Sequence, residues 1–564
     1  MSIGKRTFQS AGQISQHLVP GAYSRIDSVK GQSSIASANN GVIMGRSTGG
    51  KPATLLQFNS IAEAVQTLKG GPLMEAVRLA FNPGDDLVPQ RIYAMRVNTA
   101  VQSSYNAKAG ANTIIALTSK DYGLDNNQIT IKVEAGTTGK KVTIGYKTNT
   151  EVFDNLYRAS LTITHATATG TVTNTNATQT LALSVGSISI DLNSYPTIGA
   201  LAAYINQQSG YTAVVTPGQE NASSLQLDGT TALTLTGGVI FQSTNQAIID
   251  KLNAASGYVN AAAANGANNR ILIDNVATAV YFTGGTEGTY TATEWTAALL
   301  ALEAEDIQFI ATPDSSTTVH AAIKTHCETM SSVVGRRERQ FLVGSAWGTA
   351  VATARTNAIA LNSKWGLQAF NGFVQRDVNG VLQNFDASYT ACLLLGMTCA
   401  QAINAPLTFK KLNVISLEMK LSTSNLETLI ENGVCPCGYN AQGLPVVIRQ
   451  VNTYQTDDLK WNEFSIVKEM AFVSRDLRAY LEELFVGKPG SALYGGVIRG
   501  AVESRLAMYT DLGVFSKDDA GVAWWNVQLS IAGDTVKVDY DANITAPVNF
   551  IFITNHFHEL VSAA

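Results

Sequence analysis

Two stretches decide the fold of the C-terminal part of this chain: LKWNEFSIVKEMAFVSRDLRAYLEELFVGKPGSALYGGVIRGAVESRL at residues 459–506 and VNFIFIT at residues 548–554. In the first, apolar residues recur every three or four positions, which predicts two amphipathic helices separated by Pro489 and Gly490. The second is β-branched and aromatic without alternation, which is typical of a strand covered on both faces. Such a strand needs neighbours for its backbone hydrogen bonds, and these can lie in this chain or in another copy of it.

Length and composition favour a large protein that packs against copies of itself. The chain has 564 residues, too many for one core, and only 15% are charged, where roughly a quarter is usual. A net charge of −4 gives no basic field that would attract nucleic acid. The start of the chain lacks a secretory signal, and the apolar runs are far too short to insert into a membrane. Five cysteines, an odd number, indicate reduced thiols made in a cytoplasm.

The order of predicted elements divides the chain into five parts. Residues 1–26 form a polar arm that ends in the strand Ala22, Tyr23, Ser24, Arg25 and Ile26. Residues 27–109 and 286–455 alternate strands with helices, which predicts a parallel sheet between helical layers. Residues 110–285 are rich in Thr, Asn, Ser and Gly with short β runs, and we expect an inserted β-sandwich or barrel region. Residues 456–564 form an α+β domain.

Local signals place several helices in the α/β parts. Ser60 and Glu63 form a capping box before one helix, and Pro72 suits the first turn of the next. A second capping box is predicted at Ser424 and Glu427. The expected fold class is therefore an α/β core split by a β-rich insertion, followed by an α+β domain.

Three motifs suggest chemistry, and each has a simpler interpretation. The run Gly45-Arg46-Ser47-Thr48-Gly49-Gly50-Lys51 follows a strand and fits GxxxxGK, but Pro52 replaces the required hydroxyl residue, so a Gly-rich surface loop is favoured. Cys435 and Cys437 lack the further ligands of a zinc site.

Ser345 is not in a nucleophile elbow, and His320 and His326 lie on one predicted helix. His556 and His558 flank Phe557 after the last strand and are expected at a surface or interface. We therefore predict no catalytic site, no metal and no cofactor.

A family resemblance runs along most of the chain. It is carried by Val19-Pro20-Gly21-Ala22-Tyr23, by Arg91-Ile92-Tyr93-Ala94-Met95-Arg96-Val97, by Phe282-Thr283-Gly284-Gly285-Thr286-Glu287-Gly288, by Tyr494-Gly495-Gly496, and by residues 461–473 and 547–556. In this order, around an α/β core, these segments resemble the contractile tail sheath proteins of bacteriophages. The insertion at 110–285 carries little of the resemblance.

The resemblance implies an α/β core like that of subtilisin, without protease activity, and a virion protein of the contractile tail that is assembled in the host cytoplasm. Hexameric rings of identical subunits would stack in a helix around a tail tube, and baseplate and tail terminator proteins would be further partners. Contraction from a metastable extended state would drive the tube through the host envelope. No nucleic acid or direct membrane insertion is expected.

Site residues follow from that architecture. The expected inter-subunit strands are residues 22–26 and Val548, Asn549, Phe550, Ile551, Phe552, Ile553 and Thr554. The C-terminal domain would face the tube, with Lys468, Arg475, Arg478 and Lys488 as tube-facing candidates against the simpler interpretation of a solvated helix face. Three alternatives remain open: the sheath of a tail-derived bacteriocin or injection machine, a subtilisin-like hydrolase with β domains, and a surface adhesin or S-layer subunit.

Overall fold

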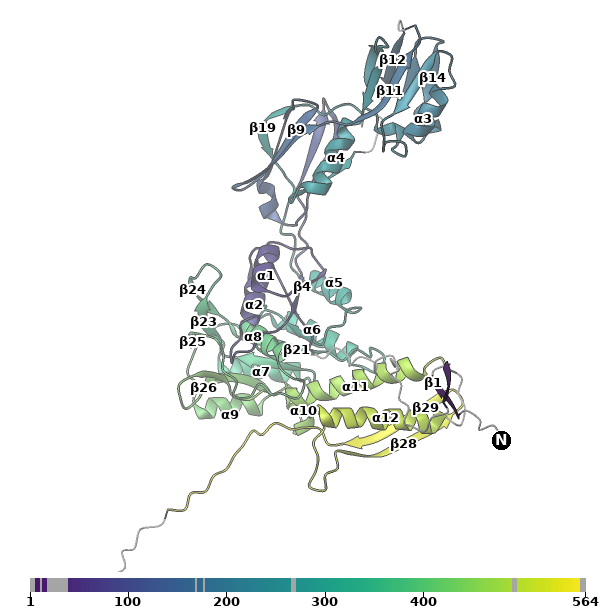
Figure 1. The fold of residues 1–564 in the computed structure, drawn as a ribbon. Helices are drawn as coiled ribbons and strands as arrows, with labels where there is room; N and C mark the ends of the chain where they lie inside the picture. Colours follow the sequence, from purple (N-terminus) through teal and green to yellow (C-terminus); the bar gives the residue numbers. More distant parts are fainter. Residues whose placement is uncertain are drawn as a thin grey trace, which may run out of the picture.

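A computed structural model shows a core that carries a projecting two-part insertion and a C-terminal helix pair (Figure 1). It describes residues 6–10, 13–17, 39–167, 170–175, 178–264, 270–488 and 494–557. The predicted strand at 22–26, the helix break at 489–490 and His558 lie outside these residues.

One eight-stranded sheet, ordered β27-β26-β22-β21-β20-β3-β5-β4, forms the centre of the core. Neighbouring strands from β26 to β5 are parallel, while the edge strands β27 and β4 are antiparallel to their neighbours. The strands are β3 (Gly41–Gly45), β4 (Leu55–Phe58), β5 (Ile92–Arg96), β20 (Phe309–Ala311), β21 (Gln340–Gly344), β22 (Gly366–Phe370), β26 (Val434–Tyr439) and β27 (Pro445–Val447). The sheet therefore joins strands that precede the insertion to strands that follow it.

Helices cover both faces of this sheet because successive strand residues point to opposite sides. Ile43 packs with α1 (Ile61–Leu68), α2 (Pro72–Ala80) and α8 (Ala387–Ala400), whereas Val42 and Met44 pack with α5 (Ala292–Leu302) and α6 (Thr317–Met330). Further core elements are α7 (Val351–Leu361), α9 (Thr423–Glu431), β23 (Phe373–Arg376), β24 (Leu382–Phe385) and β25 (Ser416–Leu417). The predicted parallel sheet between helical layers is confirmed.

Most helix starts follow from local chemistry. The Ser60 side chain accepts a hydrogen bond from the amide of Glu63, but the Glu63 carboxylate accepts from the amide of Asn59 and not from that of Ser60, so half of the predicted capping box is formed. Pro72 occupies the first turn of α2, as predicted. The second predicted capping box is wrong, because Ser422 rather than Ser424 caps α9 by accepting from the amide of Asn425.

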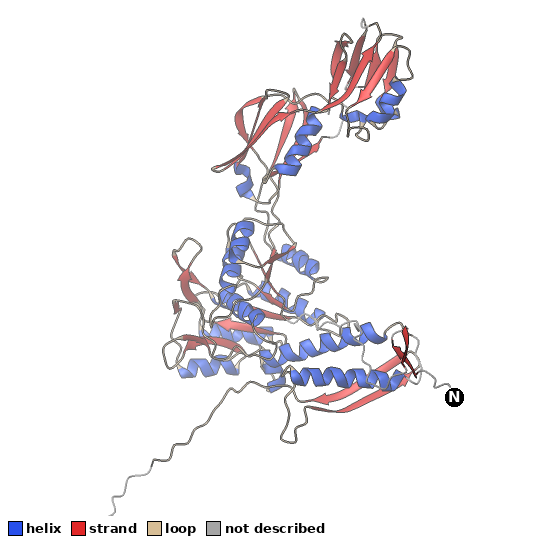
Figure 2. Ribbon diagram, viewed as in Figure 1, coloured by secondary structure: helices blue, strands red, loops and turns tan. Residues whose placement is uncertain are grey.

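The insertion consists of two β-rich units, each with its own apolar cluster (Figure 2). The unit nearer the core contains β6 (Ser104–Ala109), β7 (Asn112–Ser119), β8 (Ile129–Ala135), β9 (Lys140–Tyr146), β10 (Asn149–Leu156), α4 (Thr244–Ala255), β18 (Val259–Ala263) and β19 (Val276–Tyr281). The outer unit contains β11 (Ala159–His165), β12 (Thr171–Thr175), β13 (Thr180–Leu183), β14 (Ile188–Asp191), α3 (Ile198–Ile205), β15 (Tyr211–Val215), β16 (Thr230–Thr234) and β17 (Val239–Gln242). Residues 225–227, which belong to one of the short β runs expected in this region, instead lie in a 3₁₀ turn and its cap.

Arg96, at the end of β5, ties the insertion to the core. Its fully buried guanidinium donates from Nη1 to the carbonyl oxygens of Gly50 (2.9 Å) and Tyr122 (3.1 Å). Its Nη2 pairs with Glu287 Oε2 at 2.5 Å. Gly50 belongs to the Gly-rich loop, Tyr122 lies within the insertion after β7, and Glu287 follows the insertion in sequence. One side chain therefore holds together the loop, the unit nearer the core and the segment that returns to the core.

The C-terminal part is a pair of long helices beside a β-hairpin. Helix α10 (Leu459–Asn462) leads into α11 (Phe464–Phe485), and α12 (Tyr494–Asp511) packs on α11. Strand β28 (Trp524–Ala532) then lies against α12 and pairs with β29 (Thr535–Ala542). Near the N-terminus, β1 (Arg6–Ser10) pairs with β2 (Gln13–His17) in a separate hairpin. The two helices predicted from the apolar spacing at 459–506 are confirmed.

Candidate assembly surface

The VNFIFIT segment has no strand partner within the described chain. Residues 546–557 form neither helix nor strand, and Figure 1 shows them running away from the core and from β28 and β29. Phe552 is 92% exposed, and Ile551 and Ile553 are 80% and 77% exposed. The expected covering of both faces is therefore not provided by the part of the chain that the structure describes. Exposed apolar residues in a row are typical of a protein interaction site.

The β28–β29 hairpin forms a two-stranded sheet with open edges. Its strands pair with each other from Trp524 with Ala542 to Ala532 with Thr535, and no other strand in the described residues pairs with either. Two-stranded sheets are marginally stable alone, and an open strand edge is a template for another strand. The hairpin therefore presents strand edges at which a further strand can pair.

Helix packing holds this hairpin in place. Val527 of β28 is buried in one cluster with residues of α11 and α12, among them Phe472 and Val502. On the other side of the hairpin, Trp525, Gln528, Ser530, Lys537 and Asp539 are exposed.

A buried polar cluster fixes α12 on α11. Arg505 donates from Nε and Nη2 to the two carboxylate oxygens of Asp476, both at 2.6 Å, and the Tyr509 hydroxyl donates to Asp476 Oδ2 at 2.6 Å. The Arg505 and Asp476 side chains are only 5% and 1% exposed. Burial raises the pKa of Tyr509, with the Asp476 carboxylate adding to the effect. The geometry of the acceptor hairpin therefore depends on this cluster.

Three of the four tube-facing candidates are engaged within the chain. Lys468 is buried and donates to the carbonyl oxygens of Ala402 and Ala405, at 3.3 and 3.1 Å, and burial lowers its pKa to about 8. The prediction that Lys468 lies on a tube-facing or solvated surface is wrong, because α11 is covered on that side by the loop after α8.

The two arginine candidates bind the segment that leads into β21. Arg475 donates to the carbonyl oxygen of Glu338 at 2.8 Å, and burial lowers the pKa of Arg475 to about 10. Arg478 forms an ion pair with the Glu338 carboxylate. Lys488 is exposed, and it stays a candidate for a contact outside the chain.

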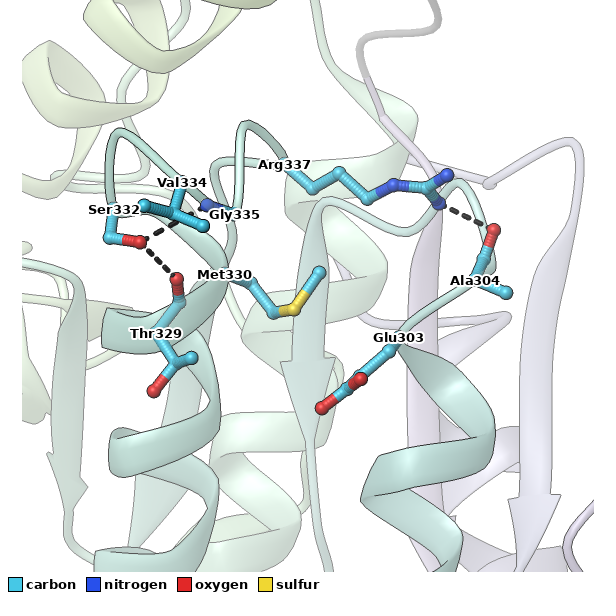
Figure 3. A pocket seen from close by; sticks show the side chains of 8 residues that line it. All are labelled: Glu303, Ala304, Thr329, Met330, Ser332, Val334, Gly335 and Arg337. Atoms are coloured by element: carbon cyan, nitrogen blue, oxygen red, sulfur yellow. Dashed lines mark hydrogen bonds between the residues drawn. The ribbon is translucent and has the colours of Figure 1, made fainter.

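A shallow hollow of about 480 Å³ lies between the C-terminal ends of α5 and α6 (Figure 3). Its polar groups are used locally, since Arg337 donates to the carbonyl oxygen of Ala304 and Ser332 Oγ donates to that of Thr329. Glu303 and Met330 reach toward its centre in Figure 3. This hollow does not bring together a nucleophile, a base and an oxyanion donor.

The Gly-rich loop is not built as a phosphate cradle. Its amides already have acceptors: Thr48 donates to Gly70 O, Gly49 to Leu68 O and Gly50 to Asp121 Oδ1, at 2.9–3.0 Å. A phosphate would need these N–H groups.

The remaining candidate catalytic and metal-ligating residues also have structural roles. Ser345 accepts from Gln368, while His320 bonds to the carbonyl oxygen of Asp314, so serine and histidine are not paired. Cys435 and Cys437 are buried in β26, and no group of three or more potential metal ligands occurs in the described residues. None of the described helices is long and apolar enough to cross a membrane.

Comparisons with known proteins agree on one class of protein. Residues 288–453 match the family described as the phage tail sheath protein central domain. The chain is 25% identical to a tail sheath protein of Bacillus phage SP01 over 95% of each chain, and 25% identical to that of Staphylococcus phage Twort over 82% of this chain and 84% of the relative. These relatives are structural tail sheath proteins and not enzymes.

The fold is shared with a solved structure. A sheath tail protein of Desulfitobacterium hafniense superposes with a TM-score of 0.55 at 11% identity, over 90% of this chain and 93% of the other. The likeness covers nearly the full length of both chains, so it includes more than the central domain.

Proposed function

We propose that this chain is the structural subunit of a contractile phage tail sheath, which polymerises as stacked hexameric rings around a tail tube. The observation that carries the proposal is that the described residues include both an exposed apolar segment and a two-stranded sheet, neither of which pairs with any other described strand. The similarity to a phage tail sheath protein over 95% of the chain supports it. The core would share the subtilisin arrangement without its catalytic residues.

Strand exchange would join the subunits. Residues 548–554 of one copy would pair with the edge of β28 or β29 of a neighbour, and residues 22–26 would come from a further copy. Seven residues in a strand span about 23 Å, which is comparable with the length of the acceptor strands. Main-chain hydrogen bonds would hold this joint while the bodies of the subunits rotate. A head-to-tail contact that does not close into a ring also generates a helix.

Contraction would need no nucleotide. The extended sheath would be metastable, kept from its lower-energy contracted lattice by a barrier. Subunits would then rotate and re-dock as rigid bodies, and newly formed interfaces would supply the work that drives the tube through the envelope. The tail tube, baseplate and tail terminator proteins would be the partners, and assembly would take place in the host cytoplasm. The sheath of an injection machine would work in the same way.

Proline substitution tests the joint without disturbing the subunit. Because Ile551 and Ile553 are about 80% exposed, the double variant I551P/I553P should fold normally while losing two strand donors. The matched control I551V/I553V keeps both donors and the β-branched shape. Negative-stain microscopy should show tubes for the native chain and the valine control, and single subunits for the proline variant. Normal tubes from the proline variant would contradict strand exchange.

A further inference from the structure

The VNFIFIT segment is free along most of its length but bound at its root. Asn549 Nδ2 donates to Glu463 Oε1 at 2.9 Å, and the guanidinium of Arg449 lies 5.6 Å from the centre of the Phe550 ring. Asn549 is half-buried, whereas Ile551 is 80% exposed. The change from bound to free chain thus occurs within two residues.

Glu463 is a rigid anchor for this root. It lies between α10 and α11, its side chain is 1% exposed, and its Oε1 accepts from Arg449 Nε at 2.9 Å and Nη2 at 2.7 Å. A single carboxylate oxygen therefore receives the fork of Arg449 and the amide of Asn549. Bonds to ionised groups are shorter and stronger than those between neutral groups, and the fork fixes direction as well as distance.

Aromatic contacts extend the ordered part of the segment beyond Asn549. The Phe550 ring lies on Arg449, and the Phe552 ring is stacked on Phe550 with centroids 6.4 Å apart and an angle of 10° between the planes. Phe552 has no further contact of this kind among the described residues and is 92% exposed. Rings placed on one side in this way give the segment a defined direction as it leaves the core.

We propose that Arg449, Glu463 and Asn549 form a root clamp that positions the exchanged strand for capture by a neighbouring subunit. This proposal rests on the proposed function and adds to it the residues that position the donor strand. The free end of the segment is bound by a second copy of this chain, at the edge of that copy's β28–β29 hairpin. Because Asn549 and Phe550 also contact their own subunit, residues 551–554 are the part of the 548–554 strand that reaches the neighbour.

The clamp matters because it shortens the flexible connection. After β29, Thr545 is still tied to the core, since its amide donates to Val514 O at 3.0 Å and its hydroxyl to Gly513 O at 2.8 Å. Without the clamp, residues 546–550 would form a linker with an end-to-end spread of about 12 Å. With it, the strand starts from a fixed point, which raises its effective concentration at the acceptor.

Distances between spin labels test the clamp in the full chain. Labels at K460C on α10 and F557C on the free segment can be attached because both positions are exposed, whereas the native cysteines are buried or half-buried. The test variant N549A/F550A removes both contacts of the segment and leaves the Arg449–Glu463 pair intact, so the core keeps its fold. The control R355M removes an exposed arginine that bonds to Asn432 elsewhere.

We expect a broader distance distribution in N549A/F550A than in the native chain and the control, and polymerisation that is about tenfold slower. An unchanged distance distribution would overturn the clamp. A broader distribution with unchanged polymerisation would overturn its positioning role. If the native chain forms no polymer, the proposed function fails, while the label distances still decide whether the clamp exists.

Discussion

Replacing Arg505 by methionine should loosen the acceptor hairpin more than any change at the helix surface. The substitution removes two 2.6 Å hydrogen bonds and leaves the Asp476 carboxylate buried, with the Tyr509 hydroxyl among its remaining donors. Removing one partner of a buried ion pair costs about 3–5 kcal/mol, because the other charge stays out of water. Since 1.4 kcal/mol corresponds to a factor of ten, local opening of α12 should become at least about a hundredfold more frequent.

Hydrogen exchange measured by mass spectrometry reports this opening directly. In R505M, the amides of α12 and β28 should lose about a hundredfold of protection, while those in the outer unit of the insertion stay unchanged. The control variant R499M changes a residue of the same helix. The side chains of Arg499 and Glu503 in this pair are 57% and 36% exposed, so the substitution should lower the free energy of unfolding by less than about 0.5 kcal/mol. Equal exchange of α12 in R505M and R499M would refute the assigned role of the buried cluster.

Two further predictions concern the core. The variant R96M should lower the free energy of unfolding by about 2–4 kcal/mol and increase hydrogen exchange around Tyr122. The control K132M removes an exposed pair with Glu134 and should change neither quantity much. Equal hydrogen exchange in both variants would argue against Arg96 as the residue that ties the insertion to the core. Burial, aided by Arg339, lowers the pKa of His326 to about 4. As the pH falls, the unfolded chain therefore takes up this proton before the folded chain does. The free energy of unfolding should decrease by up to about 3 kcal/mol between pH 6.5 and pH 4. Thermal unfolding at these pH values should show less pH dependence for H326Q.

The α/β elements of the core could be predicted because their signals are local. The Ser60 cap, the proline at the start of α2 and the apolar strand β3 each follow from a few neighbouring residues. Central strand β22 could not be recognised, since it contains Gly366 and Gln368. The structure buries Gln368 by giving its side-chain amide the carbonyl oxygen of Ala354, a contact that the sequence does not reveal.

The assembly surface was only half visible in the sequence. The run at 548–554 predicted a strand in need of neighbours, but β28 and β29, its proposed acceptor, were not recognised. Val527, Leu529 and Ile531 do alternate with polar residues in β28, although the structure buries only Val527. The exposure of charged residues on α11 was predicted wrongly for Lys468, because the sequence does not show how many sides of this helix are covered. This helix packs against both the core and α12, so Lys468 and Asp476 are buried where a helix with one covered face would expose them.

The most direct test of strand exchange is a cryo-EM map of the tubes formed by the native chain, at a resolution that traces the main chain. We predict that residues 551–554 of each subunit lie in a sheet with β28 and β29 of a neighbouring subunit, starting from a root that is still held by Glu463 of its own subunit. A lattice in which both edges of every β28–β29 hairpin are free, or in which residues 551–554 pair with their own chain, would contradict it.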